Sequence, residues 1–254
     1  MRKLPRFEDG VILTWSSLPL SLSDELGGGA IAAVGPLIYA PGSADFTWAH
    51  MTNNIDDVTT LRSIYGSPSE RAVKKEMTAL DVHCRNFIAL SPFLTMATCG
   101  ADGRLDCSPR GDAPGFVQVL NERTLLIPDR RGNNRVDSLS NIVEQGGIGL
   151  LFMVPGMNET LRVNGRARIV TDDALLEPLA VKGRAPRSGI LVDVDEAFLQ
   201  CAKALVRSHL WDPAQQIDRS SFASMGQMLA DQIEGMDGEA FDQEAADPKR
   251  YSLY

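Results

Sequence analysis

The stretch FLTMATCGADGRLDCS, residues 93–108, has the pattern of a β-hairpin. Residues 93–99 are expected to form a strand, and the Gly-Ala-Asp-Gly sequence of residues 100–103 has the chemistry of a tight turn between antiparallel strands. Residues 104–108 can therefore pair back on the first strand. A second hairpin is expected directly after this one, with strands over residues 116–120 and 124–127.

More strands follow at short spacing. Residues 147–154 are almost entirely apolar, which is typical of a strand buried on both faces. Two further strands are expected over residues 160–170 and 190–194. Helices are expected around these strands, over residues 53–65, 69–89, 135–145, 172–181, 197–209 and 220–233. This order favours a mainly β fold with flanking helices (α+β), in which a small antiparallel barrel carries helices at its rim, over a parallel α/β sheet.

The composition excludes several classes of function. A net charge of −8 argues against a general nucleic-acid binder, which needs a basic face. No apolar run reaches the roughly 20 residues of a membrane span. The four cysteines have no CxxC spacing and there are only three histidines, so no metal site is expected. Free thiols fit a reducing compartment, and a cytoplasmic location is expected.

The chain divides into three parts by sequence pattern. Residues 1–50 have no clear helical or strand period, and they allow three interpretations: a disordered extension, a secretion signal, or a segment upstream of a true start at Met51. Residues 51–213 have the pattern of a folded domain. Residues 214–254 form a polar tail, with the helix at 220–233 and a loose acidic end over residues 237–249.

The stretch IPDRRGNNR, residues 127–135, is the strongest candidate for a binding site. It places Arg130, Arg131 and Arg135 between an expected strand and an expected helix. A helix start offers unpaired backbone N–H groups, and arginine forks match phosphate oxygens. Asn133 or Asn134 can cap the helix or donate to a ligand. The alternative is a solvated basic loop that only caps the helix.

A second polar stretch, residues 106–112, lies at the end of the neighbouring hairpin. Its Ser108 and Arg110 can reach the same loop if the two hairpins are adjacent. The alternative is a simple turn with a surface Arg–Asp pair. In the helix expected over residues 197–209, Lys203 and Arg207 share one face, which can be either a basic surface or a binding face.

The strand at 160–170 carries polar residues at every second position, and they share one face of the sheet. This face is either solvated or part of an interface or ligand site. The residues are Arg162, Asn164, Arg166 and Arg168. No Ser/His/Asp or Cys/His arrangement is visible, and the catalytic residues stay unassigned.

Taken together, these stretches resemble the pyridoxamine 5′-phosphate oxidase-like FMN-binding proteins, in particular a bacterial branch described as FMN-dependent enzymes. The resemblance covers residues 56–213. It is carried by SPFL (91–94), SPRGD (108–112), PGFV (114–117), LIPD (126–129), GN (132–133), VPG (154–156), ETLRVNG (159–165), CAKA (201–204), RS (207–208) and LW (210–211).

The resemblance implies a six-stranded antiparallel split β-barrel and a homodimer with FMN in the cleft between the subunits. Ser108 and Arg110 would contact the flavin ring or ribityl chain, and Ile127 and Pro128 would lie along the ring. Trp211 would cover the flavin from the partner subunit. The phosphate would be held by Arg131, Asn133, Asn134 and Arg135.

The implied function is an FMN-dependent oxidoreductase acting on a small-molecule substrate, which Lys203 or Arg207 could bind if it is anionic. The flavin would carry the redox chemistry, which would explain the lack of a protein acid–base pair. The alternatives are a non-catalytic flavin-binding or sensing protein, and a related barrel that uses haem or a deazaflavin; scarce histidine weighs against haem. True pyridoxamine-phosphate oxidases have a C-terminal substrate-binding segment that residues 241–254 lack, so vitamin B6 oxidation is not expected.

Overall fold

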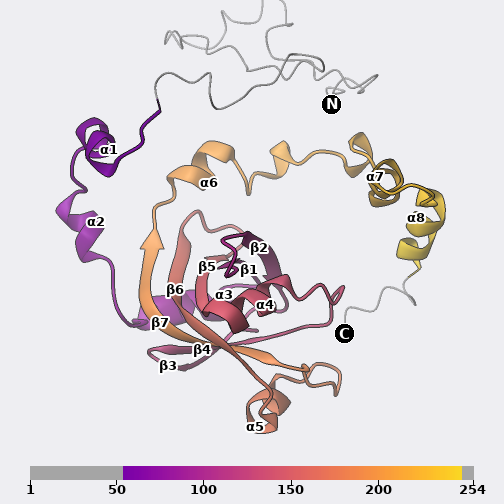
Figure 1. Ribbon diagram of the computed structural model, residues 1–254, viewed down its shortest axis with the longest axis horizontal. Coiled ribbons are helices and arrows are strands. Elements are labelled where there is room, and N and C mark those ends of the chain that lie inside the picture. Colours follow the sequence, from indigo (N-terminus) through magenta and orange to yellow (C-terminus); the bar gives the residue numbers. More distant parts are fainter. Residues whose placement is uncertain (1–53, 248–254) are drawn as a thin grey trace, which may run out of the picture. The chain divides into compact units, whose positions relative to one another are not determined.

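The computed structural model describes residues 54–247, and the interpretations of residues 1–50 lie outside this range (Figure 1). The chain divides into two units, Met1–Ser67 and Pro68–Tyr254. The first unit contributes one described helix, α1 (Val58–Tyr65). Asp57 caps this helix by accepting a hydrogen bond from the backbone N–H of Thr60 at 2.9 Å, which explains why the helix begins five residues later than expected.

The second unit is built on one antiparallel sheet with the strand order β2-β1-β5-β6-β7-β4-β3 (Figure 1). The expected architecture, an antiparallel sheet with flanking helices, is confirmed, with seven strands in place of six. The strands are β1 (Phe93–Cys99), β2 (Leu105–Gly111), β3 (Gln118–Asn121), β4 (Thr124–Pro128), β5 (Gly147–Met153), β6 (Thr160–Val170) and β7 (Gly189–Gln200). Both hairpins form as the sequence predicts.

Strands β2 and β7 extend further than the sequence indicates. Pro109 lies inside β2, which is possible because β2 is an edge strand and loses no ladder bond to the missing N–H. Strand β7 continues to Gln200, where a helix was expected from residue 197, because Ala197 pairs with Val163 and bridges to Met77. The helix expected at 197–209 is therefore reduced to α6 (Lys203–Ser208).

The helix expected over residues 69–89 is split into α2 (Glu70–Lys74) and α3 (Val82–Leu90). Asp81 starts α3 by accepting a hydrogen bond from the backbone N–H of Cys84 at 2.8 Å. The segment between the helices joins the sheet through Met77. Helix α3 packs against β3, β6 and β7, whereas α4 (Asp137–Gln145) packs against β1 and β6.

The remaining helical segments are α5 (Asp173–Leu176) with the 3-10 turn η4 (Glu177–Leu179), η5 (Pro213–Gln215), η6 (Arg219–Ser221), α7 (Met225–Gln232) and α8 (Gly238–Ala246). Helix α8 forms where a loose tail was expected, because Asp237 caps it and it packs against α7. The backbone N–H of Gly226 donates to Asp242 Oδ1 at 2.9 Å across this pair. None of the helices within residues 54–247 is long and apolar enough to cross a lipid bilayer.

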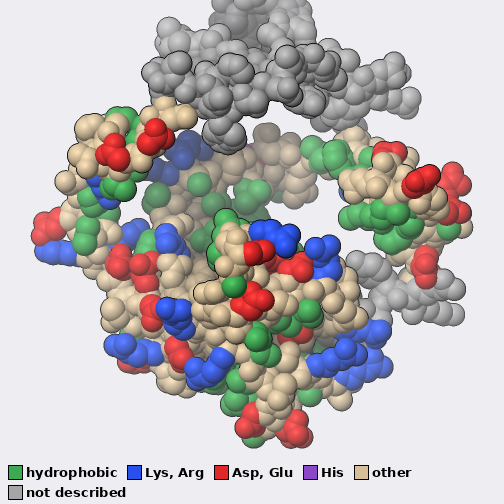
Figure 2. Space-filling view, viewed as in Figure 1, with side chains coloured by type: hydrophobic (Ala, Val, Ile, Leu, Met, Phe, Trp, Pro, Cys, Tyr) green, Lys and Arg blue, Asp and Glu red, His purple; other side chains and the backbone are tan. Residues whose placement is uncertain are grey.

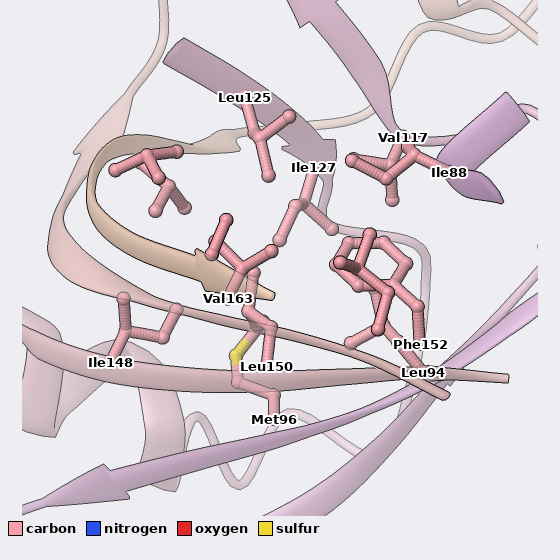
Figure 3. Packing of buried hydrophobic residues seen from close by; sticks show 14 of the residues in the cluster. Ile88, Leu94, Met96, Val117, Leu125, Ile127, Ile148, Leu150, Phe152 and Val163 are labelled. Atoms are coloured by element: carbon pink, nitrogen blue, oxygen red, sulfur yellow. The ribbon is translucent and has the colours of Figure 1, made fainter. Parts of the chain in front are cut away.

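Apolar side chains from alternate strand positions form a core on the inward face of the sheet (Figure 3). Leu94 and Met96 of β1 meet Leu150 and Phe152 of β5, and all four are at most 2% exposed. The outward residues of β5 are half-buried, so the strand expected to be buried on both faces is fully buried on one only. Burial of this alternating set is what fixes the strand register.

Cys84 belongs to this core, and burial raises the pKa of its thiol to about 11. Because the thiolate is the reactive form, we expect Cys84 to resist a thiol reagent at about pH 8 in the folded protein. Cys107 and Cys201 are exposed and should react rapidly. Labelling with Ellman's reagent before and after denaturation measures the difference. The Cys84→Ala variant should leave the rapid phase unchanged, and a loss of rapidly reacting thiol in that variant would contradict the assignment.

Candidate functional site

A cleft of about 960 Å³ lies where the ends of β2 and β4 meet the start of α4. Three segments and Phe116 line it. The segments are residues 106 and 108–111 from β2, residues 128–139 from the end of β4 to the first turn of α4, and residues 184–188 before β7. The structure thus brings together the two polar stretches that the sequence separates. The predicted site residues in the lining are Ser108, Arg110, Pro128, Arg131, Asn133, Asn134 and Arg135.

Strand β2 directs alternate side chains into the cleft, because strand residues two apart share a face. Asp106, Ser108 and Arg110 form this row. Ser138 in the first turn of α4 donates from Oγ to Asp106 Oδ2 at 2.5 Å, and its Oγ lies 2.9 Å from the Oγ of Ser108. Ser138 is only 4% exposed, so this network ties the helix start firmly to the edge strand.

The guanidinium of Arg110 is held by this network. Its Nη1 donates to Ser108 Oγ at 3.0 Å and to the carbonyl of Pro109 at 2.9 Å, and its Nη2 donates to Ser138 Oγ at 3.1 Å. Its Nε is buried and, alone among the buried side-chain polar atoms of the described residues, has no hydrogen-bond partner. A buried donor without an acceptor is unfavourable by about 1–3 kcal/mol. This atom therefore marks a place where a ligand can supply an acceptor.

Arg130 has a structural role in the loop. Its Nε lies 2.6 Å from Asp112 Oδ2, and its Nη1 donates to the carbonyl of Leu179 at 2.8 Å. The side chain of Asp112 is only 4% exposed, so this ion pair is largely shielded from solvent. Arg130 thus anchors the start of the loop. Arg131, by contrast, has no hydrogen-bond or ion-pair partner within residues 54–247 and is exposed at the cleft.

The bend before α4 has an unusual backbone. Asn134 and Val136 have φ values of 59° and 53°, in the left-handed region, which is costly for a β-branched residue such as Val136. No side chain among residues 54–247 caps α4. Asn133 and Asn134 were expected to cap the helix or to contact a ligand, and neither of them caps it. Asn133 Oδ1 instead accepts from the backbone N–H of Arg135 at 3.1 Å. The first turn of α4 therefore keeps its N–H groups for another partner.

The cleft is positively charged although the whole chain is acidic. Its lining contains six arginines and three aspartates, against a net charge of −8 for the chain. Figure 2 shows basic side chains gathered beside the loop between α5 and β7, which forms one wall. Burial raises the pKa of Asp129, while the nearby guanidinium groups of Arg110 and Arg187 oppose this shift. A lining of this charge favours an anionic ligand over a cationic one.

Four predicted residues lie elsewhere. The side chain of Ile127 is fully buried in the core, so it can meet a cleft ligand only through its backbone. Lys203 and Arg207 lie on α6 and do not line the cleft of their own chain. Trp211 donates from Nε1 to the carbonyl of Met157 at 2.7 Å. Its contact with a flavin of the partner subunit stays a prediction.

Asp106, Ser138 and Arg187 also line the cleft, although the sequence patterns did not point to them. Asp106 could have been found, because it shares the period-two face of Ser108 and Arg110. Ser138 and Arg187 reach the cleft only through long-range packing, which leaves no local signal. The described residues contain no group of three or more His, Cys, Asp or Glu side chains placed to hold a metal ion.

Residues 80–201 match the family model described as pyridoxamine 5′-phosphate oxidase. This segment is a pyridoxamine 5′-phosphate oxidase family domain. It extends from just before α3 to just after β7, and it includes every residue that lines the cleft. No curated protein matches the chain.

Several solved structures are similar to the family domain. HupZ of Group A Streptococcus is 17% identical, with 47% of this chain and 93% of that chain covered and a TM-score of 0.40. An FMN-binding protein of Syntrophomonas wolfei is 7% identical, with coverages of 56% and 97% and a TM-score of 0.36. An FAD binding protein of Mycobacterium smegmatis is 17% identical, with coverages of 49% and 97% and a TM-score of 0.34.

Proposed function

We propose that the cleft binds FMN and that the protein is an FMN-dependent oxidoreductase acting on a small-molecule substrate. The observation that carries this proposal is that the arginine loop (residues 130–135), the uncapped first turn of α4 and Arg110 converge on one cleft. Membership of residues 80–201 in the pyridoxamine 5′-phosphate oxidase family supports a flavin over other anionic ligands.

The phosphate of FMN suits the loop of residues 131–135 and the helix start behind it. A phosphate monoester carries nearly two negative charges at neutral pH and several acceptor oxygens. Arg131 offers a guanidinium that has no hydrogen-bond or ion-pair partner in the described part of the chain. The first turn of α4 offers backbone N–H groups and the positive end of the helix dipole. Asn133 and Asn134 stand beside them at the cleft.

The remaining polar donors suit the flavin ring and its ribityl chain. Ser108 and Ser138 hold the Arg110 guanidinium in one orientation, which leaves its Nε–H for an acceptor on the ligand. A fixed positive charge at this place also stabilises negative charge that develops nearby during reduction. FMN, when bound, supplies hydride-transfer chemistry that no side chain of the cleft can provide.

The proposal includes a homodimer, as the family resemblance implies. Lys203, Arg207 and Trp211 do not line the cleft of their own chain, so they could act on a ligand only across a subunit boundary. Analytical ultracentrifugation of the full chain measures the oligomeric state directly.

The test is the visible absorption spectrum of the purified protein. We expect the two bands of bound flavin, either directly or after incubation with FMN and removal of excess ligand. Riboflavin is the matched control because it lacks only the phosphate. We expect it to bind at least about a hundredfold more weakly, since two or more charge-assisted hydrogen bonds are lost. A protein that stays colourless, or that binds both flavins equally, would contradict the proposal.

Turnover of NADH or NADPH by the coloured protein separates an oxidoreductase from a protein that only holds flavin.

A further inference from the structure

The segment of residues 181–188, which we call the β7 approach, is the third arginine-bearing segment at the cleft, which it lines with residues 184–188. It begins with a tight turn in which Val181 and Arg184 exchange both backbone hydrogen bonds at 3.0 Å. The central residues Lys182 and Gly183 have φ values of 51° and 74°, as a type I′ turn requires. The two hydrogen bonds between Val181 and Arg184 therefore fix the backbone conformation of this turn.

The β7 approach is also fixed to the floor of the cleft. The backbone N–H of Asp129, just after β4, donates to the carbonyl of Ser188 at 3.0 Å. On the other side of the turn, Arg130 donates to the carbonyl of Leu179 at 2.8 Å. The end of the segment at Ser188 and the chain just before it at Leu179 are thus both attached to the residues that follow β4. Arg184 and Arg187 line the cleft from this fixed position.

The arginines of the cleft differ in how they are compensated. Arg130 and Arg135 are paired with Asp112 and Asp137, at 2.6 and 2.8 Å. Arg187 has no hydrogen-bond or ion-pair partner within the described residues and only acts on Asp129 through its electrostatic field. A phosphate bound at the start of α4 would be a partner for Arg131, which lies on a different segment. It would not provide a partner for Arg187.

We propose that Arg187, with Arg184 beside it, forms a second anion subsite that binds a phosphate or carboxylate group of the substrate. This inference rests on the proposed function and adds the class of substrate: a small molecule with an anionic group on the side away from the redox reaction. It also replaces Lys203 and Arg207, which the sequence suggested for this role, by residues of the same cleft. The subsite gives specificity, because a neutral analogue would leave the guanidinium without its partner.

The test uses the full chain loaded with FMN and three probes of similar shape: phenyl phosphate, benzoate and phenol. Binding is followed by the change in flavin absorbance. We expect one of the two anions to bind at least about tenfold more tightly than phenol, since a charge-assisted hydrogen bond contributes that much. Whichever of phenyl phosphate and benzoate binds more tightly identifies the anionic group of the substrate as a phosphate or a carboxylate. The Arg187→Gln variant should lose this preference while its affinity for FMN stays the same.

Two controls make the result specific. Arg71→Gln removes the same charge from an exposed position of α2 outside the cleft and should change nothing. Arg207→Gln tests the rival site on α6. The inference is overturned if wild type does not prefer an anion, if Arg187→Gln keeps the preference, if Arg207→Gln alone removes it, or if Arg187→Gln weakens FMN as strongly as phenyl phosphate. A colourless wild-type protein would instead show that the proposed function itself is wrong and would remove the inference with it.

Discussion

The double variant Arg131→Ala/Asn133→Ala is expected to weaken FMN binding by at least about a hundredfold. Arg131 is the guanidinium of the loop without a hydrogen-bond or ion-pair partner among residues 54–247, so its charge is available to a phosphate. Asn133 shapes the bend through its bond to the backbone N–H of Arg135. Fluorescence titration of the flavin-free protein with FMN measures the loss.

The fold should survive this double change, because both side chains are exposed and neither belongs to the core. A melting temperature close to that of wild type, measured without FMN, checks this. Affinity for riboflavin should fall much less than affinity for FMN, since riboflavin has no phosphate. Arg104→Ala is the control, because Arg104 is 90% exposed at the β1–β2 turn and does not line the cleft. Equal losses for FMN and riboflavin would place the phosphate elsewhere.

The largest loss of stability is expected at Gly165, where β6 shifts register against β7. A Cβ at this position would lie 2.1 Å from the backbone carbonyl oxygen of Asp193, far inside van der Waals contact. Because the obstacle is backbone of a central strand, no side-chain rotation can relieve it. We expect Gly165→Ala to lower the free energy of unfolding by about 3 kcal/mol or more, and Gly165→Val to prevent folding.

Thermal unfolding by circular dichroism measures the effect, expected as a fall of roughly 6–12 °C in melting temperature for the alanine variant. Gly147→Ala is the matched control, because a Cβ at Gly147, also in a strand of this sheet, would meet nothing within 4 Å. Its melting temperature should stay near that of wild type. If the two alanine variants melted alike, the close approach of β6 and β7 would not be the cause.

The features that local chemistry determines were predictable from the sequence. The Gly-Ala-Asp-Gly turn fixes the β1–β2 hairpin, and alternating apolar residues fix the inward face of the strands. The arginine loop could be recognised because its residues are consecutive. Its meeting with Ser108 and Arg110 was expected only if the two hairpins were adjacent, and this premise is wrong, because β5, β6 and β7 separate them in the sheet. The residues still line one cleft, because the ends of β2 and β4 both lie beside the start of α4.

The features that were missed depend on contacts between distant parts of the chain. The helical period of residues 69–89 continues through Met77, but pairing of Met77 with Ala197 across the sheet outweighs local helix propensity. The same contact extends β7 into the expected helix. Arg187 gave no signal, because its role depends on a turn and an anchor that bring residues 181–188 beside a loop about fifty positions earlier.

If the cleft binds FMN as proposed, the left-handed backbone at Asn134 and Val136 has a consequence for the kinetics of flavin binding. Holding a non-glycine residue in this conformation costs about 1–3 kcal/mol, and the chain incurs this cost when it folds and not when a ligand arrives. The anion-binding bend is therefore preorganised, and association needs little ordering of the chain. Under these conditions variants of the bend differ mainly in how fast the cofactor escapes, so residence time, more than the rate of encounter, sets the fraction of protein that stays loaded.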